Sequence, residues 1–443
     1  MKPAGLEPKL STFDATMIVV SLVIGIGIFR TPALVAAATG RPLVFFAAWI
    51  VGGAISAIGA LTFAEIGARF PRPGAYYAVV ADCYHSSLAF MLNWAGALMQ
   101  GAGAAGVAFI GAEHLVPFVG PGGHGPRVVQ LTAIALLLVL VGLNYLGIRT
   151  GARAQNLLSL LKIALILLLA GGAFLNAPAQ AADPSTIASS DSAAGWSGLL
   201  GGLVAVFYTY GGYHNTINVG GDVRDARRSL PQAIVLGMLL VTALYLVINL
   251  AYVRVLGLPA VAASPLVAAE AARVCFGRAG HAVVSTAIFL SAMGFVNATI
   301  LQVPRAYYAM AEDGVLPAAF LRVNPRTQVQ ELGLLCFAVT LLVPALLVGS
   351  FEKLLNYVMF TDALSLAVVA STLFVLRRRA PGAPASGWRV PGYPVLPALF
   401  VLLLAGVALR VLWTETVLAL AGAAILLAGW PLFYGMRRLA QAR

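Results

Sequence analysis

About 12 apolar runs, each long enough to cross a lipid bilayer, constrain the fold of this chain more than any other feature. They are apolar on all sides, whereas the strands of a membrane barrel alternate apolar and polar residues. We therefore predict an all-α, polytopic membrane protein with about 12 transmembrane helices. The runs fall near residues 12–39, 43–68, 86–118, 127–148, 154–176, 196–220, 231–256, 281–311, 330–350, 353–376, 392–412 and 415–436.

Composition excludes a water-soluble fold. Charged residues make up 10% of the 443 residues, against about 25% in an ordinary soluble domain. The first run has no small-residue cleavage site, so we expect a retained helix rather than a signal peptide. The sequence carries no nucleotide, zinc-protease or serine-hydrolase motif in its required context. We therefore expect no enzymatic activity and no cofactor.

The distribution of basic residues predicts the orientation in the membrane. A net charge of +12 in a soluble protein would suggest nucleic acid, but here most Lys and Arg residues fall on alternate loops. This pattern follows the positive-inside rule, so we predict an inner (plasma) membrane protein with both termini in the cytoplasm. If every run crosses once, the outer segments hold only Arg41, Arg127, Arg254, Arg273, Arg278, Lys353 and Arg410.

Two of the runs contain helix-breaking residues near their middle. The first reads Val23-Ile-Gly-Ile-Gly-Ile-Phe-Arg-Thr-Pro32, and the sixth reads Phe207-Tyr-Thr-Tyr-Gly-Gly-Tyr-His-Asn-Thr216. Transporters built from inverted repeats carry such interrupted helices at corresponding positions, and helices 1 and 6 correspond if the repeat unit is five helices. Glycines there would also allow close helix packing. Their occurrence at both matching positions favours unwound helices.

Such breaks suit a zwitterionic ligand. The N-terminus of a half-helix offers unpaired N–H groups and a positive dipole end to a carboxylate. The C-terminus of the preceding half offers carbonyl groups to an ammonium. The two ends of an amino acid are thereby held without a buried side-chain charge.

Five segments, in order along the chain, carry a resemblance to a known family. They are GIGIF (25–29), FAEIGARFPRPGAYYAVV (63–80), YTYGGYHNTINVGGDVRDARRSLPQAI (208–234), PRAYYAMAEDGVLP (304–317) and LFVLRRRAPGAPASGWRVPGYPVLP (373–397). They resemble the amino acid–polyamine–organocation superfamily, and within it the L-type amino acid transporters and their bacterial permeases. The resemblance implies a LeuT-like fold in a single membrane domain, 1–443. Helices 1–5 (12–176) and 6–10 (196–376) would form a 5+5 inverted repeat with helices 1 and 6 unwound, and helices 11 and 12 (392–436) would be peripheral.

The same resemblance implies a substrate site at the midplane, between helices 1, 3, 6, 8 and 10. The backbone of Gly25, Ile26 and Gly27 would take the substrate carboxylate. Tyr208 would be an aromatic lid over the site. The carbonyl groups that would take the amine, and the residues of helix 6 that would surround the substrate, are Val23, Ile24, Tyr208, Thr209, Tyr210, Gly211 and Gly212.

Ile26 and His214 depart from the family pattern. The family usually has Ser or Ala between the two glycines of helix 1, and a β-branched Ile26 would crowd the α-carbon of a bulky substrate. His214, beside the second break, would contact the substrate side chain and contribute to selectivity. The alternative, which is the commoner situation, is an interior histidine whose hydrogen bonds are satisfied within the protein.

Two ionisable residues lie deep within runs, where such groups are costly and usually functional. By resemblance, Lys162 in helix 5 occupies the region where sodium-driven relatives bind an ion, and it bridges helices 1 and 8 as a coupling residue. A snorkelling lysine is the alternative. Asp362 in helix 10 is expected to be a proton carrier or a polar contact for the substrate, with structural pairing to a hydroxyl as the alternative.

Charged residues at the inner ends of helices 2 and 6 form a candidate inner gate. Glu65 and Arg69 close helix 2, and charged residues from Asp222 to Arg228 follow helix 6. Solvated surface charges are the alternative. We expect Arg30, just past the first break, to face the outer vestibule.

No metal site and no disulfide-linked subunit are expected. Cys83, Cys275 and Cys336 are widely spaced and show no metal-binding or disulfide pattern. Animal members of the resembled family bond to an ancillary glycoprotein through a cysteine between helices 3 and 4, and residues 117–127 contain none.

The function expected from the sequence is secondary transport of a neutral amino acid, small or branched, by sodium-independent exchange or proton symport. A channel would need a continuous polar pore, whereas the polar residues here cluster at one depth. A membrane amino-acid sensor without turnover, or a carrier for an amino-acid-derived amine, would have much the same sequence.

Overall fold

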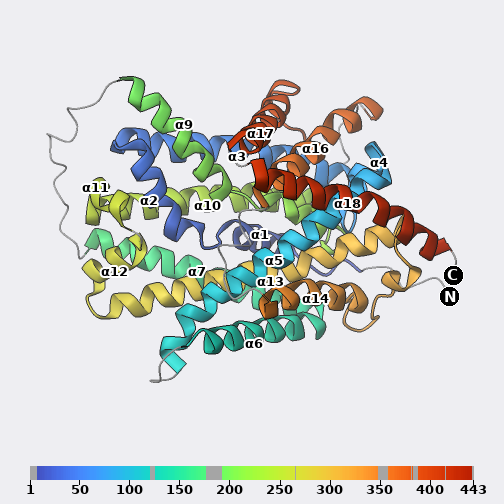
Figure 1. The fold of residues 1–443 in the computed structure, drawn as a ribbon, viewed down its shortest axis with the longest axis horizontal. Coiled ribbons are helices and arrows are strands. Elements are labelled where there is room, and N and C mark those ends of the chain that lie inside the picture. The colour runs from blue at the N-terminus through green and yellow to red at the C-terminus, as the bar shows by residue number, and fades with distance from the viewer. Residues whose placement is uncertain are drawn as a thin grey trace.

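The computed structural model describes residues 7–119, 125–175, 192–264, 266–347, 358–380, 382, 388–414 and 416–441. Within these residues every regular element is a helix, and the β-structure consists of isolated bridges from Leu10 to Val223 and from Pro73 to Val219. The prediction of an all-α fold is confirmed. The helices form one bundle, and the described chain begins and ends at the same end of it, which we call the termini end (Figure 1).

Eight helices of the described chain are long and apolar enough to cross a membrane, and the bent pair α1–α2 adds a ninth span. The helices α9, α14 and α16 overlap the predicted sixth, ninth and tenth runs, and α14 is a shorter apolar helix. A polytopic membrane fold is therefore confirmed, whereas the count of 12 spans stays a prediction. The eight are α3 (Pro42–Arg69), α5 (Ser86–Val119), α6 (Pro126–Tyr145), α7 (Ile148–Leu175), α10 (Ala226–Leu256), α13 (Ala279–Glu312), α17 (Val395–Thr414) and α18 (Thr416–Gln441).

The remaining elements complete the bundle or connect its helices. They are α1 (Thr12–Val23), α2 (Gly27–Thr39), α4 (Ala75–Cys83), α9 (Ser192–Thr209), η1 (Tyr213–Asn218), η2 (Gly220–Asp222), α11 (Leu258–Ala263), α12 (Val267–Phe276), η3 (Ala318–Leu321), α14 (Glu331–Leu347) and α16 (Val358–Arg379).

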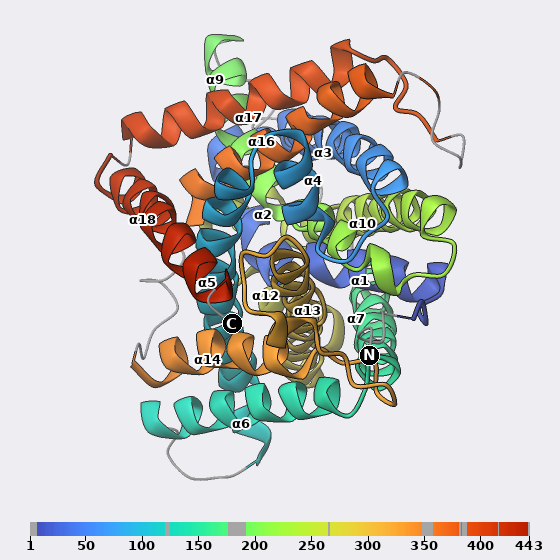
Figure 2. The same cartoon turned by 90° about the vertical axis from the view of Figure 1, so that its right-hand side faces the viewer.

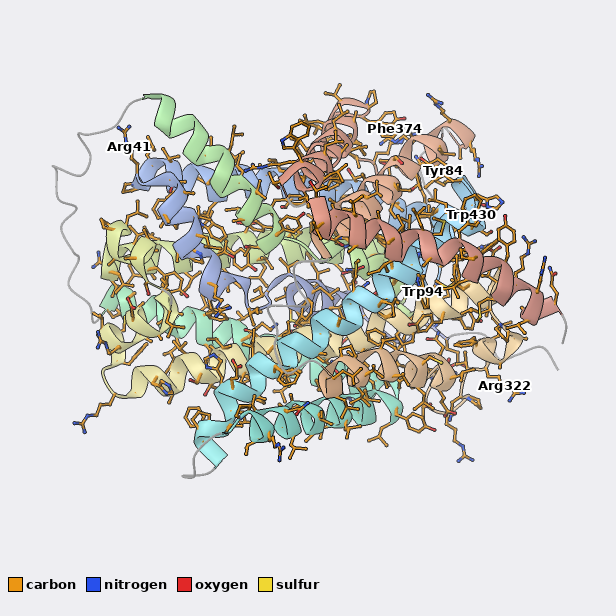
Figure 3. The ribbon with its side chains drawn as sticks, viewed as in Figure 1. Arg41, Tyr84, Trp94, Arg322, Phe374 and Trp430 are labelled. Atoms are coloured by element: carbon orange, nitrogen blue, oxygen red, sulfur yellow. The ribbon has the colours of Figure 1, made fainter. Side chains whose placement is uncertain are left out.

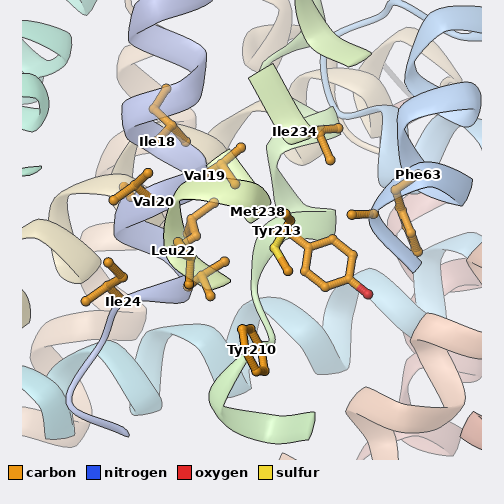
Figure 4. Close-up of a cluster of buried hydrophobic side chains, with 14 of the residues drawn as sticks. Ile18, Val19, Val20, Leu22, Ile24, Phe63, Tyr210, Tyr213, Ile234 and Met238 are labelled. Atoms are coloured by element: carbon orange, nitrogen blue, oxygen red, sulfur yellow. The ribbon is translucent and has the colours of Figure 1, made fainter. Parts of the chain in front are cut away.

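The half-helix α1 lies inside the bundle. It is apolar on all sides, and such a helix is stable only when it is surrounded by other apolar elements. Every residue from Ala15 to Val23 is buried, in contact with α7, α10 and α13. Figure 4 shows Val19 and Leu22 of α1 on the side of Met238 of α10 and Tyr213 of η1. The first break is therefore held at the centre of the molecule.

The outer helices turn apolar side chains outward. Figure 2 places α6, α17 and α18 at the edge of the bundle, and Trp413 of α17 is 89% exposed while Leu175 of α7 is 85% exposed. Large exposed apolar surfaces of this kind mark contact with a membrane or a partner. Arg41 and Arg322, predicted to lie on opposite sides of the membrane, lie at opposite ends of the bundle (Figure 3).

Both predicted helix breaks are present. Residues 24–26 separate α1 from α2, and the two halves are bent by 46°. Residues 210–212 end α9, after which the chain continues in two 3-10 helices instead of a second long half-helix. The predicted run 196–220 is therefore a half-helix followed by short turns. One reason is Gly212, whose φ of 108° does not fit a helix.

Replacing Gly212 by Ala is expected to destabilise the protein by roughly 1–3 kcal/mol, because the residue would be strained at positive φ. In addition, a Cβ atom would lie 2.3 Å from the Leu22 carbonyl oxygen. Thermal unfolding in detergent measures the loss. Gly142→Ala in α6 is the matched control, since a Cβ there meets no atom within 4 Å. Equal melting temperatures for the two variants would contradict this explanation of the break.

Candidate functional site

A cavity of about 720 Å³ lies between the two helix breaks. Its lining residues come mainly from α1, α2, α5, α9, η1, α13 and α16, with Tyr76 of α4 and Arg410 of α17. Arg30, Leu34 and Gly201 belong to the lining beyond the breaks, away from the termini end, and all three are exposed. The predicted site residues that line the cavity are Val23, Gly25, Ile26, Gly27, Tyr208, Thr209, Gly211, Gly212, His214 and Asp362.

The first break leaves main-chain N–H groups available at the cavity. The helix α2 begins after Ile26 without a hydrogen bond from a capping side chain, and the first N–H groups of any helix have no partner within it. Gly27 allows a close approach of the two broken spans, because a Cβ there would lie 3.3 Å from the Thr209 side chain. The start of α2 is therefore a positively polarised surface of the cavity.

A single tyrosine hydroxyl joins the two breaks. Tyr245 of α10 places its Oη 3.0 Å from the Val23 carbonyl oxygen and 3.1 Å from the Thr209 carbonyl oxygen, and the two oxygens share its O–H as acceptors. The hydroxyl oxygens of Thr209 and Thr31 lie 2.8 Å apart. These contacts satisfy part of the main chain that unwinding exposes, and they fix the two breaks relative to each other. Sequence reasoning missed Tyr245.

The carbonyl groups predicted to bind an amine differ in the number of hydrogen bonds that their oxygens already accept. The Val23 oxygen accepts from Tyr245 and from the N–H of Gly25, so both of its lone pairs are engaged. The oxygens of Ile24, Tyr208 and Thr209 accept from Lys162, Gly211 and Tyr245 respectively. The Thr209 oxygen, at the cavity wall, retains a second lone pair for a further donor.

Tyr210 and Ile24 lie behind the cavity wall and not on it. Tyr210 is fully buried, with its ring centroid 6.0 Å from that of Trp49 and 5.0 Å from that of Tyr245. The turn at the end of α9 directs Tyr208 to the cavity and Tyr210 into the core between α3 and α10. The predicted contact of Tyr210 with a ligand is thus replaced by a packing role.

His214 lies on the cavity wall within an aromatic cluster. Its ring centroid is 5.7 Å from that of Phe63, 5.8 Å from that of Tyr76 and 5.7 Å from that of Tyr213. Its Nδ1 atom is buried without a hydrogen-bond partner within the described chain. A fully satisfied interior histidine, the commoner situation, is not what this geometry provides. Asp362 of α16 lines the same cavity and is partly buried.

Lys162 is fully buried behind the first break. Its Nζ atom donates to the Ile24 carbonyl oxygen at 2.9 Å. On the other side lies Gly294 of α13, where a Cβ atom would be 2.9 Å from Nζ. The lysine therefore connects α7 to the end of α1 and packs against α13, as expected for a bridge between helices 1 and 8. A snorkelling lysine would reach the surface instead.

Ion pairs and main-chain hydrogen bonds join the segments that lie between the cavity and the termini end. Asp222, after the second break, pairs with Arg305 of α13 at 2.8 Å, and both are buried. The main-chain N–H groups of Lys9 and Leu10 donate to the carbonyl oxygen of Asp222 at 2.8 Å. The segment before α1 is thereby tied to the segment after the second break, and both are tied to α13.

Glu65 is the centre of a second cluster, which joins α3 to α16. Its carboxylate accepts from Arg69 at 2.8 Å, from Arg377 at 2.5 Å and from the N–H of Val390 at 2.7 Å. Sequence reasoning identified Glu65 and Arg69 but not Arg377. It also missed Arg305, because the partners are separated by 83 positions in one pair and 312 in the other.

Nothing in the described chain resembles a metal centre. No group of three or more His, Cys, Asp or Glu side chains within it has the arrangement that holds a metal ion. The chemistry of the cavity is that of main-chain dipoles, aromatic rings and a few polar side chains.

Comparisons with known proteins agree with this geometry. A family model described as amino acid permease matches residues 10–434. The serine/threonine exchanger SteT of Bacillus subtilis (strain 168) is 28% identical over 441 residues, which cover 98% of each chain. Large neutral amino acids transporter small subunit 2 of Mus musculus is 28% identical, over 97% of this chain and 81% of its own.

Asc-type amino acid transporter 1 of Homo sapiens is 26% identical, over 97% of this chain and 82% of its own. The family model spans almost the whole chain, including both helix breaks and the residues that close the termini end. This chain is a multi-pass membrane protein and belongs to the amino acid permease family of the amino acid–polyamine–organocation superfamily.

Proposed function

We propose that this protein carries small neutral amino acids across the plasma membrane by alternating access, independently of sodium. The observation that carries the proposal is the cavity between two helix breaks, where the uncapped N–H groups of α2 meet main-chain carbonyl groups at the end of α9. The N–H groups at the start of α2 bind the substrate carboxylate. The main-chain oxygens at the end of α9, those of Tyr208 and Thr209, bind its ammonium group.

The named relatives support a neutral substrate and exchange. They are a serine/threonine exchanger, a large neutral amino acid transporter and an Asc-type amino acid transporter. In our proposal Ile26 limits the space beside the α-carbon of the substrate, so the substrate is small. Tyr208 covers it as an aromatic lid.

Lys162 supports sodium independence. Its ammonium group occupies the space between α1, α7 and α13 and binds the Ile24 carbonyl oxygen directly. A positive charge there replaces what a bound cation would do, namely satisfy a freed carbonyl and hold the break in place. Asp362 lies within the same cavity, which keeps exchange and proton symport both open as coupling modes.

The distribution of basic residues supports one orientation in the membrane. We propose that the termini end faces the cytoplasm, in agreement with the basic residues around Arg322. The cavity then opens outward, and the Asp222–Arg305 pair with the Glu65 cluster forms the closed inner gate. The two halves that move are the repeats 12–176 and 196–376. No disulfide-linked subunit is required, since residues 117–127 lack cysteine.

Reconstitution in proteoliposomes tests the proposal. A preloaded neutral amino acid should drive saturable uptake of labelled amino acid (counterflow), with no dependence on sodium. A channel would give flux without counterflow, and a sensor would bind without flux. An amine carrier would prefer the decarboxylated substrate. Any of these three results would overturn the proposal.

Lys162→Ala is expected to abolish transport while leaving expression and the size-exclusion profile intact, because the freed Ile24 carbonyl loses its cationic partner. Counterflow of labelled alanine is the measurement. Arg153→Ala is the matched control, since Arg153 is an exposed cation of the same helix α7 and its loss should leave flux unchanged. Near-normal flux in Lys162→Ala would remove the lysine from the mechanism.

Asp222→Asn is expected to open the inner gate, because unpairing a buried charge costs roughly 3–5 kcal/mol and this cost falls on the closed state. The reporter is a cysteine at Ala306, which lines the cavity, in a protein whose native cysteines are replaced by serine. Labelling by an impermeant maleimide from the cytoplasmic side should accelerate by about tenfold or more. Asp225→Asn, at an exposed position, serves as control. Unchanged labelling in Asp222→Asn would exclude this pair as the gate.

A further inference from the structure

Three side-chain amides form a hydrogen-bonded row that ends on the wall of the substrate cavity. Asn218 Nδ2 donates to Gln302 Oε1 at 2.6 Å, and Gln302 Nε2 donates to Gln100 Oε1. The row crosses from η1 through α13 to α5, and all three residues contribute to the cavity lining. Neither the helix breaks nor the inner gate requires it.

The row has a fixed direction. The main-chain N–H of Tyr76 donates to Asn218 Oδ1 at 3.0 Å, so the oxygen of Asn218 is occupied and its NH₂ group must point to Gln302. Each amide then presents its NH₂ group to the next. Asn218 and Gln302 are buried, at 3% and 0% exposure, so neither is free to flip at low cost. The last member, Gln100, is left with its oxygen bonded and its NH₂ group unused.

The free NH₂ group of Gln100 has open space beside it. Within the described chain Gln100 Nε2 has no hydrogen-bond partner, and Gln100 is partly exposed to the cavity. Gly96, one turn earlier on α5, places no side chain over it, because the nearest atom to a Cβ there is Gln100 Nε2 itself at 3.9 Å. Gly103, one turn later, also faces open space. The NH₂ group of Gln100 can therefore donate to a molecule bound in the cavity, and its hydrogen bond is strengthened by the amides of Gln302 and Asn218 behind it.

An acceptor lies on the adjoining wall. The Thr361 hydroxyl donates to Met99 Sδ at 3.0 Å, which joins α16 and α5 at the positions immediately before Asp362 and Gln100. Both of those residues line the cavity. Asp362 has no hydrogen bond or ion pair within the described chain, so its carboxylate is an unused acceptor. A hydroxyl group, which both donates and accepts, matches this pair.

We propose that Gln100, held by Gln302 and Asn218, is a specificity-determining residue that donates to the side-chain hydroxyl of the substrate while Asp362 accepts from it. The preferred cargo is then a hydroxylated amino acid, serine or threonine in chemical terms, over its apolar isostere. This inference rests on the proposed function, since it concerns the side chain of the same substrate. An apolar side chain would leave both polar groups desolvated and unpaired, which is what rejects it.

Counterflow in proteoliposomes with two isosteric pairs, threonine against valine and serine against alanine, tests the inference. The wild-type protein is expected to transport the hydroxylated member of each pair with the higher kcat/KM. Gln100→Leu should reduce the threonine/valine ratio by about 3- to 10-fold, the value of one hydrogen bond. Most of the change should lie in the KM for threonine.

Two further variants keep the test decisive. Gln302→Leu leaves Gln100 in the cavity but frees it to turn, and should lower the ratio in the same direction. Gln130→Leu replaces an amide of α6 that bonds the Ala345 carbonyl far from the cavity, and should leave the ratio unchanged. A wild-type preference for valine, or equal losses for threonine and valine in both cavity variants, would overturn the inference. Absence of counterflow for every amino acid would instead overturn the proposed function.

Discussion

The structure depends on main-chain polar groups that two membrane spans leave unpaired at their centres. In a hydrocarbon environment such groups cost several kcal/mol each unless they find partners. This protein supplies partners for some of them and leaves others to the cavity. Tyr245 binds one carbonyl group at each break, and Lys162 binds the Ile24 carbonyl group of the first break. The groups that remain, at the start of α2 and the end of α9, are those that suit the two ends of an amino acid.

The rest of the architecture places and protects these breaks. The half-helix α1 is buried on all sides, so the first break is held at the centre and cannot move toward lipid. The conformation of Gly212 and the small size of Gly27 bring the second break against the first. Between the cavity and the termini end, Asp222 of the segment after the second break bonds two other elements. Its carbonyl oxygen accepts from the segment before α1, and its carboxylate pairs with Arg305 of α13. One residue therefore links the elements that have to separate if the termini end is to open.

Sequence reasoning predicted the all-α fold, the two breaks and the part of the cavity lining that comes from the breaks themselves, because these follow from local signals. Apolar run length gives the spans, and glycines in mid-run give the breaks. It placed Tyr210 on the cavity because neighbouring residues of a break were treated alike, whereas the turn sends Tyr208 and Tyr210 to different sides. It missed Tyr245, Arg305, Arg377 and the amide row. Their partners are distant in sequence, and a polar residue in an apolar run does not indicate which residue it contacts.

The most direct test of the central claim is whether both charged ends of the substrate are needed for binding. Alanine, alaninamide (without the carboxylate) and propionate (without the ammonium) can be compared as competitors of labelled alanine counterflow. If main-chain groups at the two breaks each hold one end, both truncated compounds should compete about 10- to 100-fold more weakly than alanine, since each loses charge-assisted hydrogen bonds. Competition by propionate or alaninamide as strong as that of alanine would contradict the account.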